Sequence, residues 1–247
     1  MLDPQTALIC AAALFIGGFT KGIAGLGLPM IAVPLLAFAV NLPTAVAMLV
    51  LPTVATNLVQ TFQRGAFVPV LRRFWSLLLP FLPSILIGAK LLVSLDEHIL
   101  YAVLGVAILA VTLLIRAAPH FSVGPRAERW LSPTVGAASG MLGGASSLFG
   151  PVLMVYLLTL RLDKTMYIAT VSLLYFTGAA GFGLALSAVG GFGAHQLLLS
   201  GLALIPVFLG MWVGQKIGDR LDRRNFEHVL HVLYIATAAT FFYKAFA

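Results

Sequence analysis

Charged residues are scarce in this chain of 247 residues: they make up 9% of it, while 60% of the residues are hydrophobic. A soluble domain usually carries about 25% charged residues. A chain so poor in charge cannot cover its surface with polar groups, so its solvent must be lipid. The apolar segments are also far longer than the roughly ten-residue alternation typical of an outer-membrane barrel. We therefore predict an all-α, polytopic helical membrane protein.

Groups that catalyse reactions or bind cofactors are equally scarce. Cys10 is the only cysteine, which excludes an intrachain disulfide and a cysteine metal cluster. We find no phosphate-binding loop, haem attachment motif or Ser-His-Asp pattern. An intramembrane hydrolase would have to use Ser146 or Ser147, and neither has a paired base. We therefore expect no enzyme activity, no cofactor and no metal site.

Two histidines near the C-terminus are the remaining candidates for proton transfer or metal binding. His228 and His231 are three residues apart and lie beside Glu227. Because they stand at the start of the last apolar span, next to a charged turn, an interfacial role is favoured.

A long apolar run near the N-terminus is interrupted by glycines. The run from residue 6 to residue 40 contains one charge, Lys21, and exceeds the about 20 residues that one helical span requires. Five glycines precede Pro29 within it. Because glycine weakens a helix interior and proline is tolerated in a first turn, we predict half-helices at roughly 6–20 and 29–40, joined by a bent segment that carries Lys21. Irregular backbone at membrane depth needs protein or water to satisfy it, so this break is a candidate binding site.

The same pattern returns in the second half of the chain. A second apolar run, 132–160, contains a glycine cluster that precedes Pro151. Aligned on Pro29 and Pro151, the halves are offset by 122 residues. The alignment pairs Gly18 with Gly140, Gly22 with Gly144 and Lys21 with Gly143. Separately, the ends of the apolar spans at 74–93 and 197–217 match, with Gly88 and Lys90 paired with Gly214 and Lys216.

These features predict two repeats, each with one broken hairpin helix and three transmembrane helices. The first repeat covers 1–116 and the second covers 131–247, with a cytoplasmic connecting loop at 117–130. The full spans are expected at 43–62, 74–93 and 99–115 in the first repeat, and at 165–188, 197–217 and 227–245 in the second.

Basic residues decide the predicted topology. With Lys21 set aside, 14 of the 15 Lys and Arg remain. If each broken segment enters and leaves on one face, twelve lie on one face and only Lys90 and Lys244 on the other. If each segment crosses once, the split is seven to seven. The positive-inside rule therefore selects hairpins, with the loops 64–73, 116–130 and 216–225 in the cytoplasm.

Three crossings follow each hairpin, so both termini are expected outside and the second repeat inverted. Inverted repeats with broken helices are the architecture of secondary transporters, whose sites lie near the membrane midplane. The same topology explains the net charge of +7, so we expect no nucleic acid partner.

Lys21 is the first candidate for substrate binding. A lysine inside a span costs about 2.5–3.5 kcal/mol on insertion scales, so it needs a partner or a purpose. It could supply a positive charge to an anion site, or it could snorkel to the cytoplasmic surface. The N-termini of the second half-helices, at 28–30 and 150–152, also favour anions through free amides and the helix dipole. The alternative role of the glycines is close helix packing.

Polar side chains complete the candidate lining. Thr53, Asn57 and Gln60 lie along one helical stripe that could solvate a small anion between the hairpin tips. The alternative is interhelical hydrogen bonding, worth about 0.6 kcal/mol per contact. The predicted substrate site as a whole consists of Lys21, Gly22, Gly25, Gly27, Thr53, Asn57, Gln60, Ser146, Ser147, Gly150, Tyr175 and Thr177.

The two glycine-rich breaks carry a resemblance to a known family. The first motif comprises Gly17, Gly18, Lys21, Gly22, Gly25, Gly27, Pro29 and Pro34; the second comprises Gly140, Gly143, Gly144, Gly150 and Pro151. Over essentially the whole chain, this pattern resembles the TauE/SafE family of membrane transporters. The second motif departs from the family pattern, with Ser146, Ser147 and Phe149 in place of further glycines. The resemblance implies export of sulfite, organosulfonates and related small anions across the bacterial inner membrane.

The leading hypothesis is a secondary transporter of a small sulfur-containing anion, driven by an ion gradient without nucleotide. One alternative is a non-transporting scaffold or assembly protein, which would have no reason to place Lys21 in a broken helix. Another is a transporter of a carboxylate, or of a metal cation, although the eight Asp and Glu lie in turns or at span ends. The expected partners are the small anion and the lipid bilayer, with a homodimer left open.

Overall fold

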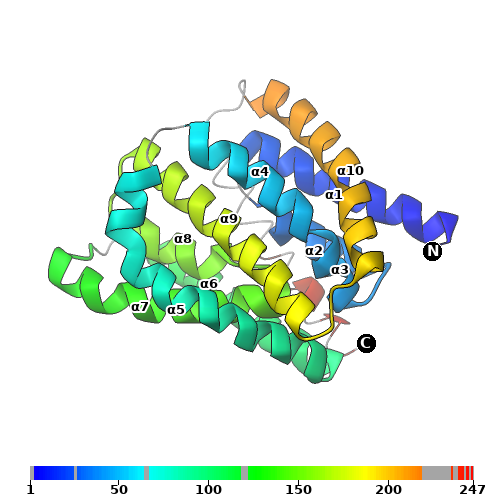
Figure 1. The fold of residues 1–247 in the computed structure, drawn as a ribbon, viewed down its shortest axis with the longest axis horizontal. Helices are drawn as coiled ribbons and strands as arrows, with labels where there is room; N and C mark the ends of the chain where they lie inside the picture. Colours follow the sequence, from blue (N-terminus) through cyan, green and yellow to red (C-terminus); the bar gives the residue numbers. More distant parts are fainter. Residues whose placement is uncertain are drawn as a thin grey trace. The chain divides into compact units, whose positions relative to one another are not determined.

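The structure is a computed structural model that describes residues 3–24, 27–63, 67–117 and 122–218, together with isolated residues between 235 and 246. Within these residues it contains ten helices and no strand, so the predicted all-α fold is confirmed (Figure 1). The helices are α1 (Pro4–Ala24), α2 (Leu28–Leu36), α3 (Leu42–Met48), α4 (Val50–Gln63), α5 (Phe67–Ser94), α6 (Glu97–Ala117), α7 (Pro125–Ser146), α8 (Gly150–Thr159), α9 (Lys164–Ala188) and α10 (Ala194–Gly218).

Five segments in the described residues are long and apolar enough to cross a membrane. Large apolar side chains also cover the surface of these helices: Leu8, Leu79 and Leu184 are 73%, 69% and 75% exposed. A soluble protein would bury such residues, whereas lipid solvates them without cost. The chain is therefore a polytopic membrane protein. The membrane-crossing segments are Pro4–Ile23, Leu42–Thr61, Phe67–Ser94, Met166–Ala188 and Ala194–Ile217.

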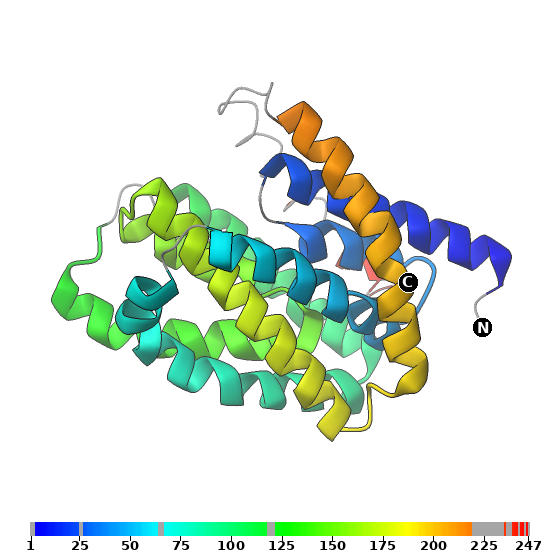
Figure 2. The same ribbon diagram turned by 45° about the horizontal axis from the view of Figure 1, so that its top comes forward.

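The helices form two compact units that do not coincide with the two halves of the chain. Unit 1 comprises Met1–Pro52, Asp96–Leu109 and Phe192–Ala247, and unit 2 comprises Thr53–Leu95 and Ala110–Gly191. In unit 1, α1 packs against α10 and α2; in unit 2, α7 packs mainly against α5. The pair α1 and α10 and the pair α5 and α7 each lie side by side in Figures 1 and 2. Each unit thus combines a hairpin from one half with the second full span of the other half.

Glycines allow α1 and α10 to approach each other closely in unit 1. A Cβ atom added at Gly18 would clash with the carbonyl oxygen of Val207, and one added at Gly22 would clash with that of Met211. Small residues serve this purpose at helix contacts in membranes, where van der Waals packing drives association. The close-packing interpretation of these two glycines is therefore confirmed.

Unit 2 uses glycine in the same way at the positions that the sequence alignment pairs with those of unit 1. A Cβ atom at Gly140 would clash with the carbonyl oxygen of Phe81, and one at Gly144 would clash with that of Ile85. The two units therefore share one packing scheme between the first helix of a hairpin and a long span. The repeat boundaries and the inversion of the second repeat stay predictions.

The first break lies later in the chain than predicted. The half-helix expected at 6–20 in fact continues to Ala24, so Lys21 lies in the last turn of α1 rather than in a bent segment. The glycines inside α1 are accommodated because they pack against α10, and α2 begins only at Leu28. The hairpin is consequently unequal: α1 spans about 31 Å and α2 about 14 Å.

Two further boundaries differ from the prediction because helices extend beyond the apolar runs. Arg72 and Arg73, predicted in a loop, lie in the first turns of α5, which departs from helical geometry at Phe74. Likewise, α7 begins at Pro125, inside the predicted connecting loop, because proline suits a first helical turn. The last predicted span, 227–245, lies largely outside the described residues.

Candidate functional site

Lys21 is buried inside unit 1, with 3% of its surface exposed. It lies one turn after Gly17, whose missing Cβ would contact Leu28 and Ala32 of α2. Residues four apart share a helix face, so Lys21 lies on the stripe of α1 that faces its hairpin partner. Its position in the last turn also favours the positive charge, because the backbone carbonyls there form the negative end of the helix dipole.

The tip of the first hairpin has room beside the start of α2. Gly27 takes a left-handed conformation, with φ of 97°, and caps α2 without a side-chain hydrogen bond. A Cβ atom at Gly27 would meet only the terminal carbon of Met30, at 4.0 Å, among the described atoms. The positive dipole end of α2 therefore lies at this tip, an arrangement that favours anions.

The second hairpin breaks at two serines. α7 ends at Ser146, and Ser147 follows it in the left-handed conformation with φ of 62°. The hydroxyl of Ser146 donates to the carbonyl of Leu142 at 2.7 Å and accepts the amide of Leu148 at 3.3 Å. The hydroxyl of Ser147 is buried and has no hydrogen-bond partner within the described residues. A buried polar group without a partner costs about 1–3 kcal/mol, so Ser147 is suited to a ligand or a water molecule.

Aromatic side chains fill the tip of the second hairpin. The ring of Phe149 occupies the space where a side chain at Gly143 would lie. Tyr175 places its hydroxyl against Gly150, the first residue of α8, and hydrogen-bonds to its backbone. Phe149 and Tyr175 pack edge to face, with ring centroids 6.1 Å apart. The first residue of α8 thus already faces a protein hydroxyl.

The predicted polar stripe on α4 is largely bonded within its own helix. The side-chain amide of Asn57 donates to the carbonyl of Thr53 at 2.8 Å, and the hydroxyl of Thr61 donates to the carbonyl of Asn57 at 2.8 Å. Such back-bonding is the ordinary way to satisfy a buried polar side chain in a helix. The hydroxyl of Thr53 is different: it is buried and has no partner among the described residues.

Several predicted site residues of unit 2 lie on α9 or next to it. Ser172 donates to the side-chain oxygen of Gln60 at 3.5 Å, and Tyr175, three residues later, contacts Gly150. Thr177 instead donates to the carbonyl of Leu173 at 2.8 Å. Gln60, Tyr175 and Gly150 are therefore gathered around one stripe of α9, whereas Thr177 satisfies its own helix.

The structure thus divides the predicted site residues between the units. Lys21, Gly22 and Gly27 belong to unit 1, and Gly22 serves helix packing. Gly25, like His228 and His231, lies outside the described residues. The polar residues that follow Pro52 belong to unit 2. The expectation of one site between the two tips stays a prediction.

Two residues with clear roles in unit 2 were missed by the sequence prediction. Ser172 bonds Gln60, and nothing in its sequence context marks it. Phe149 could have been found, because the offset of 122 residues pairs it with Gly27 and pairs Gly143 with Lys21. At each of these two aligned positions, one hairpin has a large side chain where the other has glycine, which indicates that the two hairpins place their bulky side chain at different points.

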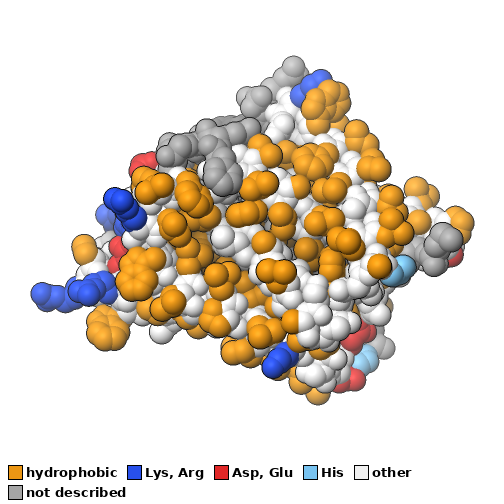
Figure 3. All heavy atoms as spheres, in the orientation of Figure 1, with side chains coloured by type: hydrophobic (Ala, Val, Ile, Leu, Met, Phe, Trp, Pro, Cys, Tyr) orange, Lys and Arg blue, Asp and Glu red, His pale blue; other side chains and the backbone are white. Residues whose placement is uncertain are grey.

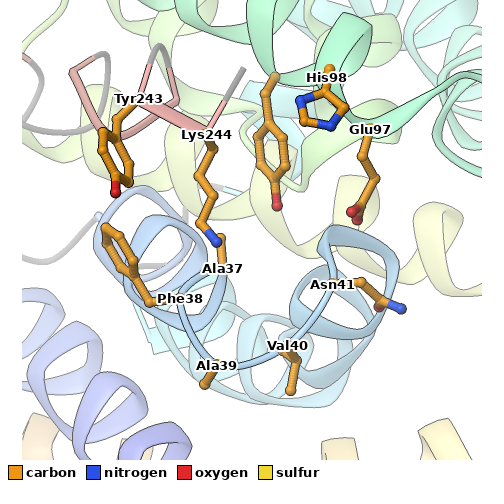
Figure 4. Close-up of a pocket in the computed structure, with 10 residues that line it drawn as sticks. Ala37, Phe38, Ala39, Val40, Asn41, Glu97, His98, Tyr243 and Lys244 are labelled. Atoms are coloured by element: carbon orange, nitrogen blue, oxygen red, sulfur yellow. The ribbon is translucent and has the colours of Figure 1, made fainter. Parts of the chain in front are cut away.

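A separate cavity of about 610 Å³ lies at the far end of α2 in unit 1. Figure 4 shows Lys244 extending toward Ala37 beside Phe38, while Glu97 lies above Asn41. The ammonium of Lys244 is 5.3 Å from the centre of the Phe38 ring, and Glu97 accepts the amide of Leu42 at 2.9 Å. The charged groups of this cavity contact the segment that connects α2 to α3 and the start of α3.

A comparison with families of known proteins decides what the two glycine-broken hairpins belong to. The family described as Sulfite exporter TauE/SafE matches residues 9–241, which include both hairpins and every described helix from α2 to α10. The chain belongs to this family. Comparisons with curated proteins and with solved structures returned no match.

Membership of the TauE/SafE family confirms the resemblance seen in the sequence. It implies a multi-pass membrane exporter of sulfite or a related anion, and the members of the family are transporters rather than enzymes. The buried side chain of Lys21 and the positive dipole end of α2 are features that an anion transporter can use.

Proposed function

We propose that this protein exports sulfite or an organosulfonate, and that the first hairpin holds the anion. The observation that carries the proposal is Lys21, a buried lysine in the last turn of α1, on the stripe that faces α2. A positive charge and the positive end of a helix dipole at one hairpin favour the same ligand, a small anion. At an effective dielectric constant of 20, two unit charges 4 Å apart attract by about 4 kcal/mol, several times the value in water.

The second hairpin has a supporting role in this proposal. Phe149 and Tyr175 occupy its tip, so its remaining capacity for an anion lies in hydroxyl groups. Those of Ser147 and Thr53 are buried and unpartnered in the described part of unit 2, so each is free to donate. They would solvate an anion on its path without trapping it by charge.

The transport mode follows from the family and from the sequence. We propose alternating access driven by an ion gradient, because the chain has no phosphate-binding loop to couple transport to nucleotide. The bacterial inner membrane is the proposed location, with both termini outside. One grouping supports this topology, because the cavity beside Lys244 gathers residues that are all predicted outside. The basic residues Arg73, Arg126 and Arg129 are all predicted inside.

Reconstitution in liposomes tests the function. Purified protein should raise sulfite flux well above that of protein-free liposomes, with organosulfonates and small carboxylates compared in the same assay. A matched cation and a neutral solute of similar size serve as controls. Flux of the cation would favour a cation transporter, and no flux of any anion under any imposed ion gradient would favour a scaffold. Either result would exclude the proposal.

Thiol labelling tests the topology. In a Cys10→Ala background, a single cysteine at His98 should react with an impermeant thiol reagent in intact cells, and one at Ser122 should not. Labelling of both positions would contradict the hairpin topology while leaving the anion site untouched.

A further inference from the structure

We propose that the groove between the beginnings of α5 and α7 binds the headgroup and one acyl chain of an anionic phospholipid. The groove lies wholly in unit 2 and has a volume of about 910 Å³. It is separate from both hairpin tips, and the inference does not depend on the transported substrate. The lining residues on α5 are Arg73, Trp75, Ser76, Leu79 and Pro80, and those on α7 are Pro125, Glu128, Arg129, Ser132 and Pro133.

One end of the groove is positively charged. The guanidinium of Arg73 donates to both oxygens of Glu128, at 2.9 and 3.0 Å, which fixes its position between α5 and α7. Arg129 lines the groove next to this pair, and Arg72 and Arg126 are exposed nearby in the sequence. Two arginines and one glutamate line this end of the groove, so it carries a net positive charge that suits a phosphate group.

The start of α7 adds to this preference. Gly124 caps α7 without a side-chain hydrogen bond, and Pro125 occupies its first turn. Backbone amides at such an end attract phosphate oxygens. Since α7 has 22 residues, its dipole is fully developed, and Arg129 lies one turn above its start.

The remainder of the groove is apolar and faces lipid. Leu79 is 69% exposed and Trp75 is 60% exposed, and Pro80 and Pro133 line the wall between them. The departure from helical geometry at Phe74 separates the arginine-bearing turn of α5 from this apolar length. A charged end continued by an apolar wall matches the two parts of a phospholipid.

Exposed tryptophan marks the level of the lipid headgroups. Trp75 lines the groove, and Trp130, beside Arg129, is 80% exposed. Tryptophan is enriched at the membrane–water interface, where basic residues on the cytoplasmic side attract anionic lipid. In Figure 3, several Lys and Arg side chains lie at the left, where α5 and α7 begin, next to hydrophobic surface, while others lie at the top and the bottom of the view. A soluble phosphate would use only the charged end, so the bilayer lipid is the better-fitting occupant.

Tryptophan quenching tests the proposal directly. The chain has three tryptophans, so Trp130→Phe with Trp212→Phe leaves Trp75 as the sole reporter. In nanodiscs, phosphatidylglycerol with brominated acyl chains should quench Trp75 at least threefold more efficiently than brominated phosphatidylcholine. The matched control keeps Trp212 alone, which is 57% exposed and has the ammonium of Lys216 3.7 Å from its ring centre, but lies outside the groove.

Two arginine variants test whether the lipid preference arises from the groove or from the overall positive charge of the protein. Arg129→Gln should reduce the phosphatidylglycerol preference of Trp75 at least threefold, whereas Arg161→Gln, an exposed arginine outside the groove, should leave it unchanged. Equal quenching by the two lipids, or an equal effect of the two variants, would overturn the proposal. Loss of the preference on addition of soluble phosphate at equimolar concentration would also overturn it, because the occupant would then be a free anion. Unfolding temperatures of both variants show whether each is folded.

Discussion

The two hairpins place a large and a small residue at equivalent positions in opposite order. In the first hairpin, Lys21 is the large residue inside the helix and Gly27 is the glycine at the tip. In the second, Gly143 is the small residue inside the helix and the ring of Phe149 covers it. The matching positions therefore carry a lysine and a glycine in the first hairpin, and a glycine and a hydrocarbon ring in the second.

This comparison shows that a broken helix alone does not make an anion site. Each break exposes helix ends, but at the second tip Tyr175 already bonds the backbone of Gly150. Among the described residues, the first hairpin carries a buried lysine in its first helix, whereas the second carries Gly143 at the matching position. This asymmetry supports the proposal that the first hairpin recognises charge and the second provides packing.

The largest effect is expected from replacing Lys21, the residue that distinguishes the first hairpin from the second. Lys21→Ala should lower sulfite flux in liposomes at least tenfold, because loss of about 1.4 kcal/mol of attraction already lowers affinity tenfold. Lys21→Arg should retain part of the flux, since it keeps the charge but changes the shape. Lys216→Ala removes an exposed lysine from the last turn of α10 and should leave the flux unchanged.

The next effect tests whether the two units are packed alike. Gly22→Ala and Gly144→Ala each place a methyl group against a backbone carbonyl, so each should lower the free energy of unfolding by about 1–3 kcal/mol. Gly201→Ala has no atom within 4 Å of the added carbon among the described residues and should be neutral or slightly stabilising. Thermal unfolding in detergent measures all three. A loss confined to one unit would show that the shared packing scheme is only apparent.

A smaller effect sharpens the assignment of the second tip. Tyr175→Phe removes the hydroxyl that bonds the backbone of Gly150, and should cost about 0.5–1.5 kcal/mol of stability. Sulfite flux should stay within threefold of the unmodified protein, because the ring and its contact with Phe149 remain. A flux as low as that of Lys21→Ala would place the substrate at the second tip.

The smallest effect concerns the polar stripe of α4. Asn57→Ala removes a hydrogen bond to the carbonyl of Thr53 within the same helix, so it should lower stability by about 1 kcal/mol. Sulfite affinity should change less than it does in Lys21→Ala. An equal loss of affinity would return Asn57 to the substrate-binding residues.

The sequence predicted the spans that the structure describes, the two breaks and the buried lysine, because each depends on local composition. It placed the first break too early, since a glycine that packs and a glycine that breaks a helix look alike in sequence. Gly18 and Gly22 are held in α1 by Val207 and Met211, whose positions are almost 190 residues away. Long-range contacts of this kind decide which glycines remain helical.

The same limit applies to the candidate site. Lys21 was predictable because a charge in an apolar run is conspicuous and costly. The bonding of Asn57 and Ser146 to their own helices was not predictable. A polar side chain in a span can either line a binding site or bond to the backbone of its own helix, and the sequence does not distinguish the two. The aromatic filling of the second tip depends on Tyr175, which only folding brings to Gly150.

Equilibrium binding of sulfite to Lys21 variants tests the central claim most directly, because it separates recognition from the later steps of transport. The dissociation constant is measured by calorimetry on purified protein, with Lys216→Ala as the matched control and thermal unfolding as the check of folding. We predict that Lys21→Ala raises the dissociation constant at least tenfold, that Lys21→Arg raises it less, and that Lys216→Ala leaves it unchanged. An unchanged dissociation constant in folded Lys21→Ala would contradict the account, because the first hairpin would then not supply the charge that holds the anion.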